Sequence, residues 1–252
     1  MNDLETYFYN NPGRLIHKWT HYFEAYDRHF QRFRNKKVVI LEIGVYQGGS
    51  LQMWKHYFGP QAEIYGIDLN PMCKQYEEEN ITILTGSQSD RQFLQKVRAT
   101  IPPVDILIDD GGHTMRQQII TFEELFGHVK PDGVYLCEDI QTSYQITYGG
   151  GYKRKGTFIE YSKNFIDLLH AYHSTQSGLT VTDFTRSVKS LHYYDSILVI
   201  EKGQHNTPEH VKTGTASHED TPTKKVPAWK TNVVMALNKI LRAMNLPNYK
   251  WK

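Results

Sequence analysis

The sequence contains little cysteine and no long apolar segment. Its 252 residues include two cysteines, Cys73 and Cys137, which are too few for a disulfide framework. The first residues, MNDLETYFYNN, lack the basic and apolar regions of a secretory signal. No apolar run approaches the roughly 20 residues of a membrane-spanning helix. We therefore expect a cytoplasmic protein and neither a disulfide-rich scaffold nor an integral membrane protein.

The chain also lacks an excess of charge of one sign. It carries 29 basic and 27 acidic residues, a formal net charge of +2, whereas whole-protein nucleic-acid binders usually have a strong basic excess. We expect no nucleic-acid partner. The charge is nevertheless divided unevenly, because residues 224–252 contain seven basic residues and no acid. The tail therefore has a formal charge of +7. Because the whole chain has +2, residues 1–223 have a formal charge of −5.

Apolar runs alternate with helical patterns through most of the chain. Continuous strand-like runs end at or near acidic or glycine residues, in KKVVILEIG, AEIYGIDLNP, ITILTG, VDILIDDGG and VYLCEDI, with helical segments between them. Strands that are apolar throughout are typical of a parallel sheet covered on both faces. VKSLHYYDSILVIEKG adds an antiparallel pair at the edge. We predict an α/β, doubly wound, Rossmann-like sheet that is mostly parallel.

Two further helices are predicted outside this sheet. Pro12 opens an N-terminal helix over residues 12–34, whose apolar residues recur at spacings of three and four: Leu15, Ile16, Trp19, Tyr22, Phe23, Tyr26 and Phe30. A C-terminal helix, basic and amphipathic, lies within residues 224–252. The predicted organisation is a domain over 1–203, a polar linker over 204–223 and this tail.

The tail has three interpretations that stay open. It docks on a second subunit, binds an anionic membrane surface or other anionic partner, or packs on its own domain. The first would make a homo-oligomer, and the second would place the protein at the membrane periphery.

The first candidate site follows the strand-like run that ends near residue 43. Glycines in EIGVYQGG let backbone N–H groups approach a ligand, and Asp68, after the next strand, is placed to accept bonds from ribose hydroxyls. The spacing is not GxGxxG, because Gly44 and Gly48 are four apart and Tyr46 stands where the middle glycine would be. The pattern favours a nucleoside cofactor without a pyrophosphate, such as S-adenosylmethionine. The alternative is that the glycines serve only a tight turn.

The second candidate site combines IDDGGH and CEDI, after two strands that end side by side in a doubly wound fold. Asp109, Asp110, Glu138 and Asp139 would crowd carboxylates together, which is costly unless a cation compensates. Oxygen ligands suit magnesium, with manganese or calcium as alternatives, better than zinc. His113 would lie beside the metal as a general base. The alternative is a solvated acidic loop.

Read in order, LEIGVYQGGSLQMWKHYFGP, YGIDLNP, GSQSD, IDDGGH and YLCEDIQTSY resemble class I S-adenosylmethionine-dependent methyltransferases. They are most similar to the metal-dependent macrolide sugar O-methyltransferases of the mycinamicin and macrocin type, to which cephalosporin-hydroxylase-like proteins are related. The resemblance covers residues 12–202 and implies a magnesium-dependent O-methyltransferase that acts on a sugar hydroxyl of a glycoside, natural product or glycan.

The resemblance also implies roles for individual residues. Magnesium would be held by Asp110, Glu138 and Asp139, and His113 would be the catalytic base. The implied cofactor residues are Glu42, Gly44, Tyr46, Gly48, Ser50, Asp68, Ser87, Gln88 and Asp109. One departure is that the family usually has GDQ where this chain has Gly86-Ser87-Gln88, so a carboxylate expected near the adenosine is missing.

A glycine-rich aromatic segment, TSYQITYGGGYKRKG, is long for a strand-to-helix loop, and we interpret it as a substrate lid. Its candidate sugar-contacting residues are Tyr144, Tyr148 and Tyr152, because aromatic rings pack against sugar C–H faces. Generic packing is the alternative for each. Three other functions also stay open for the chain: a nicotinamide-dependent oxidoreductase, a metal-dependent hydrolase and a ligand-binding module without catalysis.

Overall fold

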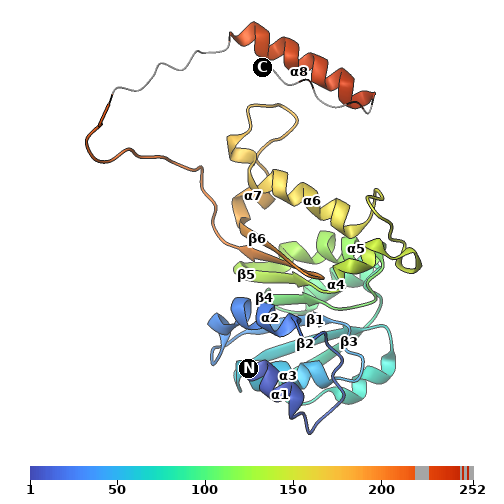
Figure 1. The fold of residues 1–252 in the computed structure, drawn as a ribbon. Helices are drawn as coiled ribbons and strands as arrows, with labels where there is room; N and C mark the ends of the chain where they lie inside the picture. The colour runs from blue at the N-terminus through green and yellow to red at the C-terminus, as the bar shows by residue number, and fades with distance from the viewer. Residues whose placement is uncertain (219–226, 245, 247–248, 250–252) are drawn as a thin grey trace. The chain divides into compact units, whose positions relative to one another are not determined.

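The computed structural model describes residues 1–218, 227–244, 246 and 249 (Figure 1). The chain divides into two compact units, Met1–Pro208 and Glu209–Lys252. The first unit contains the sheet, and the second contains the helix α8 (Ala228–Ala243). Linker residues 219–223 lie outside the described residues, and so do the tail lysines Lys224, Lys225, Lys250 and Lys252.

The first unit is built on a seven-stranded sheet with the order β3-β2-β1-β4-β5-β7-β6. Strands β1 to β5 are parallel, and the edge pair β7 and β6 is antiparallel. The predicted fold class is therefore confirmed. The strands are β1 (Val39–Ile43), β2 (Glu63–Asp68), β3 (Ile81–Thr85), β4 (Val104–Asp109), β5 (Val129–Cys137), β6 (Val188–Tyr194) and β7 (Ile197–Lys202).

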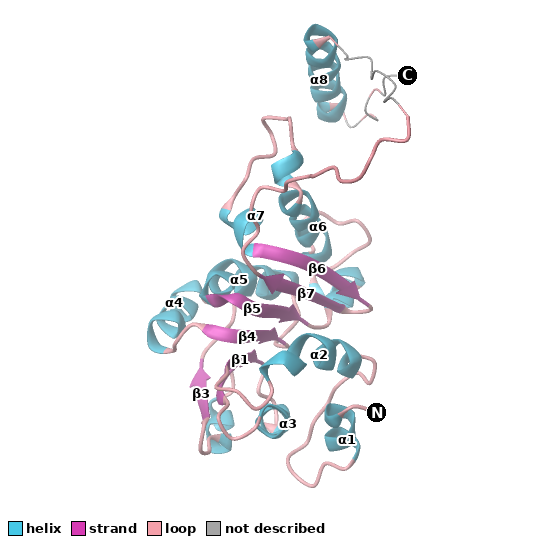
Figure 2. Ribbon diagram, turned by 90° about the vertical axis from the view of Figure 1, so that its left-hand side faces the viewer, coloured by secondary structure: helices cyan, strands magenta, loops and turns pink. Residues whose placement is uncertain are grey.

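Helices cover both faces of the sheet (Figures 1 and 2). One core layer packs α1 (Asp3–Tyr9), α2 (Tyr22–Phe30) and α3 (Gly49–Phe58) on the sheet. The opposite layer contains α4 (Arg91–Thr100), α5 (Met115–Leu125), α6 (Phe158–Leu169) and α7 (Asp183–Ser187). Because both faces are covered, the central strand β1 is buried along its whole length, all five of its residues included.

The strand order reverses between β1 and β4, which are hydrogen-bonded neighbours. The connection from β1 leads toward β2 on one side, whereas β4 leads toward β5 on the other. The loops that follow these strands diverge and leave a crevice at the carboxyl edge of the sheet. This position brings the two candidate sites of the sequence to one place.

The predicted helix over residues 12–34 is wrong in its first half. The chain forms α1, then an irregular segment, and α2 begins only at Tyr22. A turn closed by Asn11 starts this segment: its Oδ1 accepts from the Gly13 N–H at 2.8 Å, and its Nδ2 donates to the Arg14 carbonyl at 2.8 Å. This hydrogen bonding competes with helix formation.

Contacts with α3 also hold residues 14–16 of this irregular segment in place. A Cβ added at Gly49 would lie 2.4 Å from the Leu15 carbonyl oxygen and 2.5 Å from that of Arg14. The Arg14 N–H also donates to Gln52 Oε1 at 3.2 Å. Residues 14–16 therefore run across the start of α3, where a side chain at position 49 would block them. Local periodicity carries no information about such a contact.

The described part of the chain contains no helix that is both long and apolar enough to cross a membrane.

Candidate active site

A cleft of about 790 Å³ opens where β1, β2, β4 and β5 end. The loops after these strands line it, together with residues 17–19 of the irregular N-terminal segment. The predicted site residues in the lining are Gly44, Tyr46, Asp68, Ser87, Gln88, Asp110, His113, Glu138, Asp139 and Tyr148. The structure thus brings ten of the predicted residues together in one cleft.

The loop after β1 is held by the acid after β2. Asp68 Oδ2 accepts from the backbone N–H groups of Val45 at 2.9 Å and Tyr46 at 3.0 Å, and Asp68 Oδ1 accepts from the Asn70 N–H at 2.8 Å. The Asp68 carboxylate lines the cleft while it fixes the loop. It can therefore both shape a nucleoside site and present lone pairs to it.

Gly44 lies where two loops come into contact. Its φ is +96°, and an added Cβ would lie 2.0 Å from the Asp110 carbonyl oxygen. Both the backbone conformation and the close approach require glycine at this position. The glycine therefore lets the loop after β1 pack directly against the loop after β4.

Glu42 and Ser50 lie behind the cleft. The Glu42 carboxylate is fully buried and accepts from Ser50 Oγ at 2.7 Å and from Trp54 Nε1 at 3.1 Å. Burial raises its pKa, an effect that Lys18 opposes. These contacts join β1 to α3, and the residues support the cleft without lining it. Gly48, also outside the lining, precedes α3 with a φ of +75°.

Gln88 and Asp109 support the loop that contains the acids. Gln88 Nε2 donates to Asp109 Oδ1 at 3.0 Å, and Gln88 Oε1 accepts from the Gly112 N–H at 2.7 Å. Asp109 is buried, and burial raises its pKa to about 7, although the Gln88 hydrogen bond acts in the opposite direction. The Gln88 amide thus bonds both Asp109 and Gly112, and it fixes the shape of the loop after β4.

A lysine lies inside the acidic cluster. Lys18 Nζ donates to Asp110 Oδ2 at 2.5 Å and to Glu138 Oε1 at 2.8 Å, and it lies 3.7 Å from Glu42 Oε1. The Lys18 side chain is 2% exposed. Burial acts against its charge, but the three carboxylates outweigh burial and raise its pKa. One cation therefore lies among three carboxylates, which leaves an excess of negative charge if all three are ionised.

The Asp139 carboxylate is oriented by donors on one of its oxygens. Oδ1 accepts from Tyr22 OH at 2.6 Å, Gln141 Nε2 at 2.9 Å and Trp19 Nε1 at 3.0 Å. Burial works against ionisation, but the hydrogen bonds from Gln141 and Tyr22 and the charge of Lys18 help to outweigh it and lower the pKa of Asp139. With Oδ1 saturated, Oδ2 is left to face His113 Nε2 at 3.2 Å.

His113 and Asp139 share an unusual backbone conformation. Their φ angles are +55° and +53°, in the left-handed region, which typically costs about 1–3 kcal/mol for a residue with a side chain. The Thr142 hydroxyl lies 2.9 Å from the His113 carbonyl oxygen and 2.7 Å from that of Asp139. Two strained residues are thus held together in the cleft. Such strain is commonly found at ligand sites.

The donors present fit a hard divalent cation. Ligand atoms of Asp110, His113 and Asp139 lie within 4.8 Å of one another. Magnesium takes oxygen ligands and usually binds proteins through one or two carboxylates, with its other positions filled by water or substrate. Asp110 and Asp139 supply such a pair. Glu138, the third predicted ligand, is bonded to Lys18 and is 1% exposed.

The predicted tyrosines separate into different environments. Tyr148 lines the cleft, whereas Tyr144 lines a neighbouring cavity of about 420 Å³ and Tyr152 is 78% exposed. The glycine run between them is compact, because an added Cβ at Gly150 would lie 2.4 Å from the Thr142 carbonyl oxygen. Of the three tyrosines, Tyr148 alone lines the cleft.

Sequence reasoning missed Lys18, Trp19 and Tyr22. The three residues lie within the predicted helix over residues 12–34, and Trp19 and Tyr22 belong to its apolar stripe. The one signal in the sequence was the crowding of acids, which required a cation. Nothing local pointed to Lys18 as that cation.

A family model described as a methyltransferase domain matches residues 41–140. Mycinamicin VI 2''-O-methyltransferase of Micromonospora griseorubida is 34% identical over 82% of this chain and 53% of its own length. Demethylmacrocin O-methyltransferase of Streptomyces fradiae is 39% identical over 81% of this chain and 53% of its own length. The chain thus spans about half the length of these curated relatives.

Solved structures give the same result. The MycE methyltransferase of the mycinamycin biosynthetic pathway, in complex with Mg, SAH and mycinamycin VI, superposes with a TM-score of 0.70 at 33% identity. The match covers 80% of this chain and 53% of that one. The resemblance inferred from the motifs is therefore confirmed, and with it the methyltransferase type of Rossmann-like fold.

Proposed function

We propose that this chain, which carries a methyltransferase domain and is related to the sugar O-methyltransferases of antibiotic pathways, methylates a sugar hydroxyl of a glycoside or similar natural product. S-adenosylmethionine would be the methyl donor. One observation carries the proposal: the nucleoside-type loop held by Asp68 and the Asp110, His113, Asp139 group line the same cleft.

The cofactor half of the cleft is formed by β1, β2 and their loops. Asp68 would accept from the ribose hydroxyls, and Gly44, Tyr46 and Gln47 line the cleft beside it. Ser87 and Gln88 line the cleft beside them. Gln88 uses its amide within the protein, so Ser87 is the nearer candidate to contact the adenosine. A sulfonium methyl is already electrophilic, and these residues need mainly to position it.

The chemical half of the cleft makes the acceptor oxygen nucleophilic. His113 Nε2 faces the carboxylates, whereas Nδ1 is buried and has no hydrogen-bond partner among the described residues. Nε2 would be the nitrogen that takes the proton of the acceptor hydroxyl as its oxygen attacks the methyl group. Loss of that proton leaves the ether oxygen neutral and S-adenosylhomocysteine as the second product.

Asp110 and Asp139 are the residues that would hold magnesium, which would supply Lewis-acid polarisation of the acceptor hydroxyl. Tyr22, Trp19 and Gln141 orient Asp139 so that one oxygen stays available. Lys18 balances part of the negative charge behind this pair, where Glu42 and Glu138 are buried. Vicinal sugar hydroxyls suit such a site because both oxygens of a diol can bind one cation.

The acceptor would approach past Tyr148, whose ring offers a face for sugar C–H groups. For the basic tail all three predictions stay open: docking on a second subunit, binding an anionic surface or partner, and packing on its own domain.

Calorimetry with S-adenosylhomocysteine tests the cofactor assignment. We expect the wild-type chain to bind it and Asp68→Asn to bind it at least about 10-fold more weakly, because the substitution removes the charge that attracts ribose hydroxyls. Asp90→Asn is the matched control, since asparagine also caps a helix well and Asp90 caps α4 outside the cleft. Failure of the wild-type chain to bind would overturn the proposal.

A further inference from the structure

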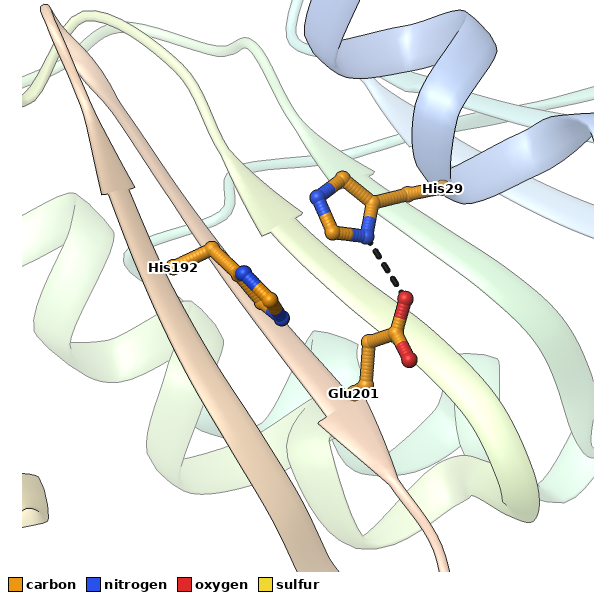
Figure 3. Close-up of side chains that lie close together, drawn as sticks. All are labelled: His29, His192 and Glu201. Carbon is orange, nitrogen blue, oxygen red and sulfur yellow. Dashed lines mark hydrogen bonds and ion pairs between the residues drawn. The ribbon is translucent and has the colours of Figure 1, made fainter.

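A second group of metal-ligand side chains lies outside the cleft, between α2 and the antiparallel edge of the sheet. His29 comes from α2, His192 from β6 and Glu201 from β7. One ligand atom from each lies within 4.8 Å of the other two. Figure 3 shows the three side chains converging from the helix and the two strands. None of them lines the candidate active site.

Strand register explains why these side chains meet. His192 pairs with Val199 and Ser190 pairs with Glu201, so His192 and Glu201 are diagonal neighbours on one face of the antiparallel pair. Val199 belongs to the core layer that contains α2. Because side chains alternate along a strand, His192 and Glu201 point to the same side, toward α2.

The contacts of His29 fit those of a metal-binding imidazole. His29 Nδ1 lies 2.6 Å from Glu201 Oε1, and His29 Nε2 lies 2.9 Å from the Tyr194 hydroxyl. A metal-binding histidine typically uses one ring nitrogen for the metal and the other for a hydrogen bond that fixes the ring. Tyr194 supplies that bond on the side away from Glu201. The His29 side chain is 2% exposed, so its ring is also fixed by packing.

The two partners have more freedom than His29. The Glu201 side chain is 27% exposed, and His192 is partly exposed. Zinc bonds of about 2.0–2.1 Å in a tetrahedral site place neighbouring ligand atoms roughly 3.3 Å apart. Small rotations of these accessible side chains would bring the ligand atoms to that spacing, with Glu201 Oε1 moving away from its 2.6 Å contact with His29 Nδ1.

We propose that His29, His192 and Glu201 form a zinc site that fastens α2 to the edge strands β6 and β7. Two imidazoles and one carboxylate are ligands that zinc accepts, whereas magnesium prefers a set made of oxygens. The fourth position would be taken by water. Because α2 also carries Tyr22, which orients Asp139, the site would stabilise the element beside the active site without entering it.

The test measures zinc binding to the full chain with magnesium in large excess, so that the carboxylates of the cleft are occupied. We expect the wild-type chain to bind one zinc ion. His192→Phe keeps an aromatic ring beside His29, 4.6 Å between centroids in the structure, but has no ligand atom. We expect its zinc affinity to fall by more than the roughly 10–100-fold typical for losing a hydrogen-bond partner of a ligand.

Two further variants show whether a loss of zinc binding comes from a ligand of this site. One controls for misfolding of the protein, and the other controls for zinc bound in the cleft. Glu201→Gln removes a charged ligand with little change in shape and should also weaken zinc binding. His113→Asn, in the cleft, should leave zinc binding unchanged. Added zinc should raise the midpoint temperature of thermal unfolding, Tm, of the wild type and of His113→Asn. It should not raise the Tm of His192→Phe.

Three results would contradict the zinc site. Absence of zinc binding in the wild type would overturn the proposal. So would unchanged affinity in both His192→Phe and Glu201→Gln, or loss of binding in His113→Asn alone, which would place the ion in the cleft. None of these results depends on methyl transfer, so the zinc site and the proposed function can fail separately.

Discussion

Lys18 Nζ lies 2.5 Å from Asp110 Oδ2, although the two residues are 92 positions apart in the chain. The contact connects the irregular N-terminal segment to the loop after β4. It also gives the acidic cluster a positive charge of its own, next to the carboxylates that would hold magnesium. The N-terminal segment is thus part of the candidate active site.

Lys18→Met should destabilise the protein strongly. The substitution keeps the length of the side chain but leaves buried Glu138 and Glu42 without their cation. Removing one partner of a buried ion pair typically costs about 3–5 kcal/mol. Urea denaturation of the full chain, followed by a signal from unit Met1–Pro208, would measure the loss in free energy of unfolding. We expect magnesium to recover more stability in this variant than in the wild type.

Lys74→Met is the matched control, because the Lys74–Glu77 pair is an i,i+3 ion pair whose lysine is 50% exposed. Such pairs contribute about 0–1 kcal/mol. Equal stability of the two variants would contradict the role given to Lys18.

His113→Asn should separate binding from turnover. We expect kcat to fall by about 10²–10⁴-fold, the usual contribution of general acid–base catalysis, with little change in affinity for S-adenosylhomocysteine. Single-turnover kinetics and calorimetry measure the two quantities. His170→Asn, at an exposed position at the end of α6, serves as the control. A His113→Asn enzyme with wild-type turnover would remove the base from the mechanism.

Tyr22→Phe should weaken magnesium binding without weakening cofactor binding. The substitution removes the 2.6 Å hydrogen bond that orients Asp139. Loss of a hydrogen-bond partner of a metal ligand typically costs about 10–100-fold in affinity. The magnesium dependence of turnover and direct titration would both report the change.

Tyr57→Phe loses a similar bond, from Tyr57 OH to Asp27 at 2.7 Å, on a different part of the fold. It should keep the wild-type magnesium affinity. If both variants shift this affinity equally, the orientation argument for Tyr22 fails.

Gly44→Ala should disrupt the cleft. The new Cβ would meet the Asp110 carbonyl, and the φ of +96° is unfavourable for alanine. Backbone strain and overpacking each typically cost about 1–3 kcal/mol. We expect lower thermal stability and weakened binding of S-adenosylhomocysteine. Gly127→Ala is the control, because nothing lies within 4 Å of the new Cβ. It should leave thermal stability and S-adenosylhomocysteine binding nearly unchanged. Similar behaviour of the two variants would contradict the close approach of the loops.

Much of the fold could be predicted because its signals are local. Strands such as β1 (VILEI) and β4 (VDILID) are mostly apolar. Asp109 ends β4, and Glu138 directly follows β5. Neighbouring parallel strands end at one edge, so sequence position alone placed these acids together. The same rule placed Asp68 beside the loop after β1.

The rest could not be predicted because it depends on contacts between distant segments. The turn at Asn11 and the passage across Gly49 decide that residues 12–21 are not helical, against their apolar spacing. Likewise, His29 and Glu201 are 172 positions apart and meet only after the edge strands have paired. No spacing rule connects them.

The most direct test of the account is transfer of a ¹³C-labelled methyl group from S-adenosylmethionine to glycosides with adjacent free hydroxyls, followed by NMR. With magnesium and the wild-type chain, we predict an O–¹³CH₃ signal on a sugar oxygen. Chelation with EDTA should abolish the signal, and added magnesium should restore it. Label on a nitrogen or carbon atom, no label on any acceptor by a chain that binds S-adenosylhomocysteine, or full transfer after chelation would contradict the account.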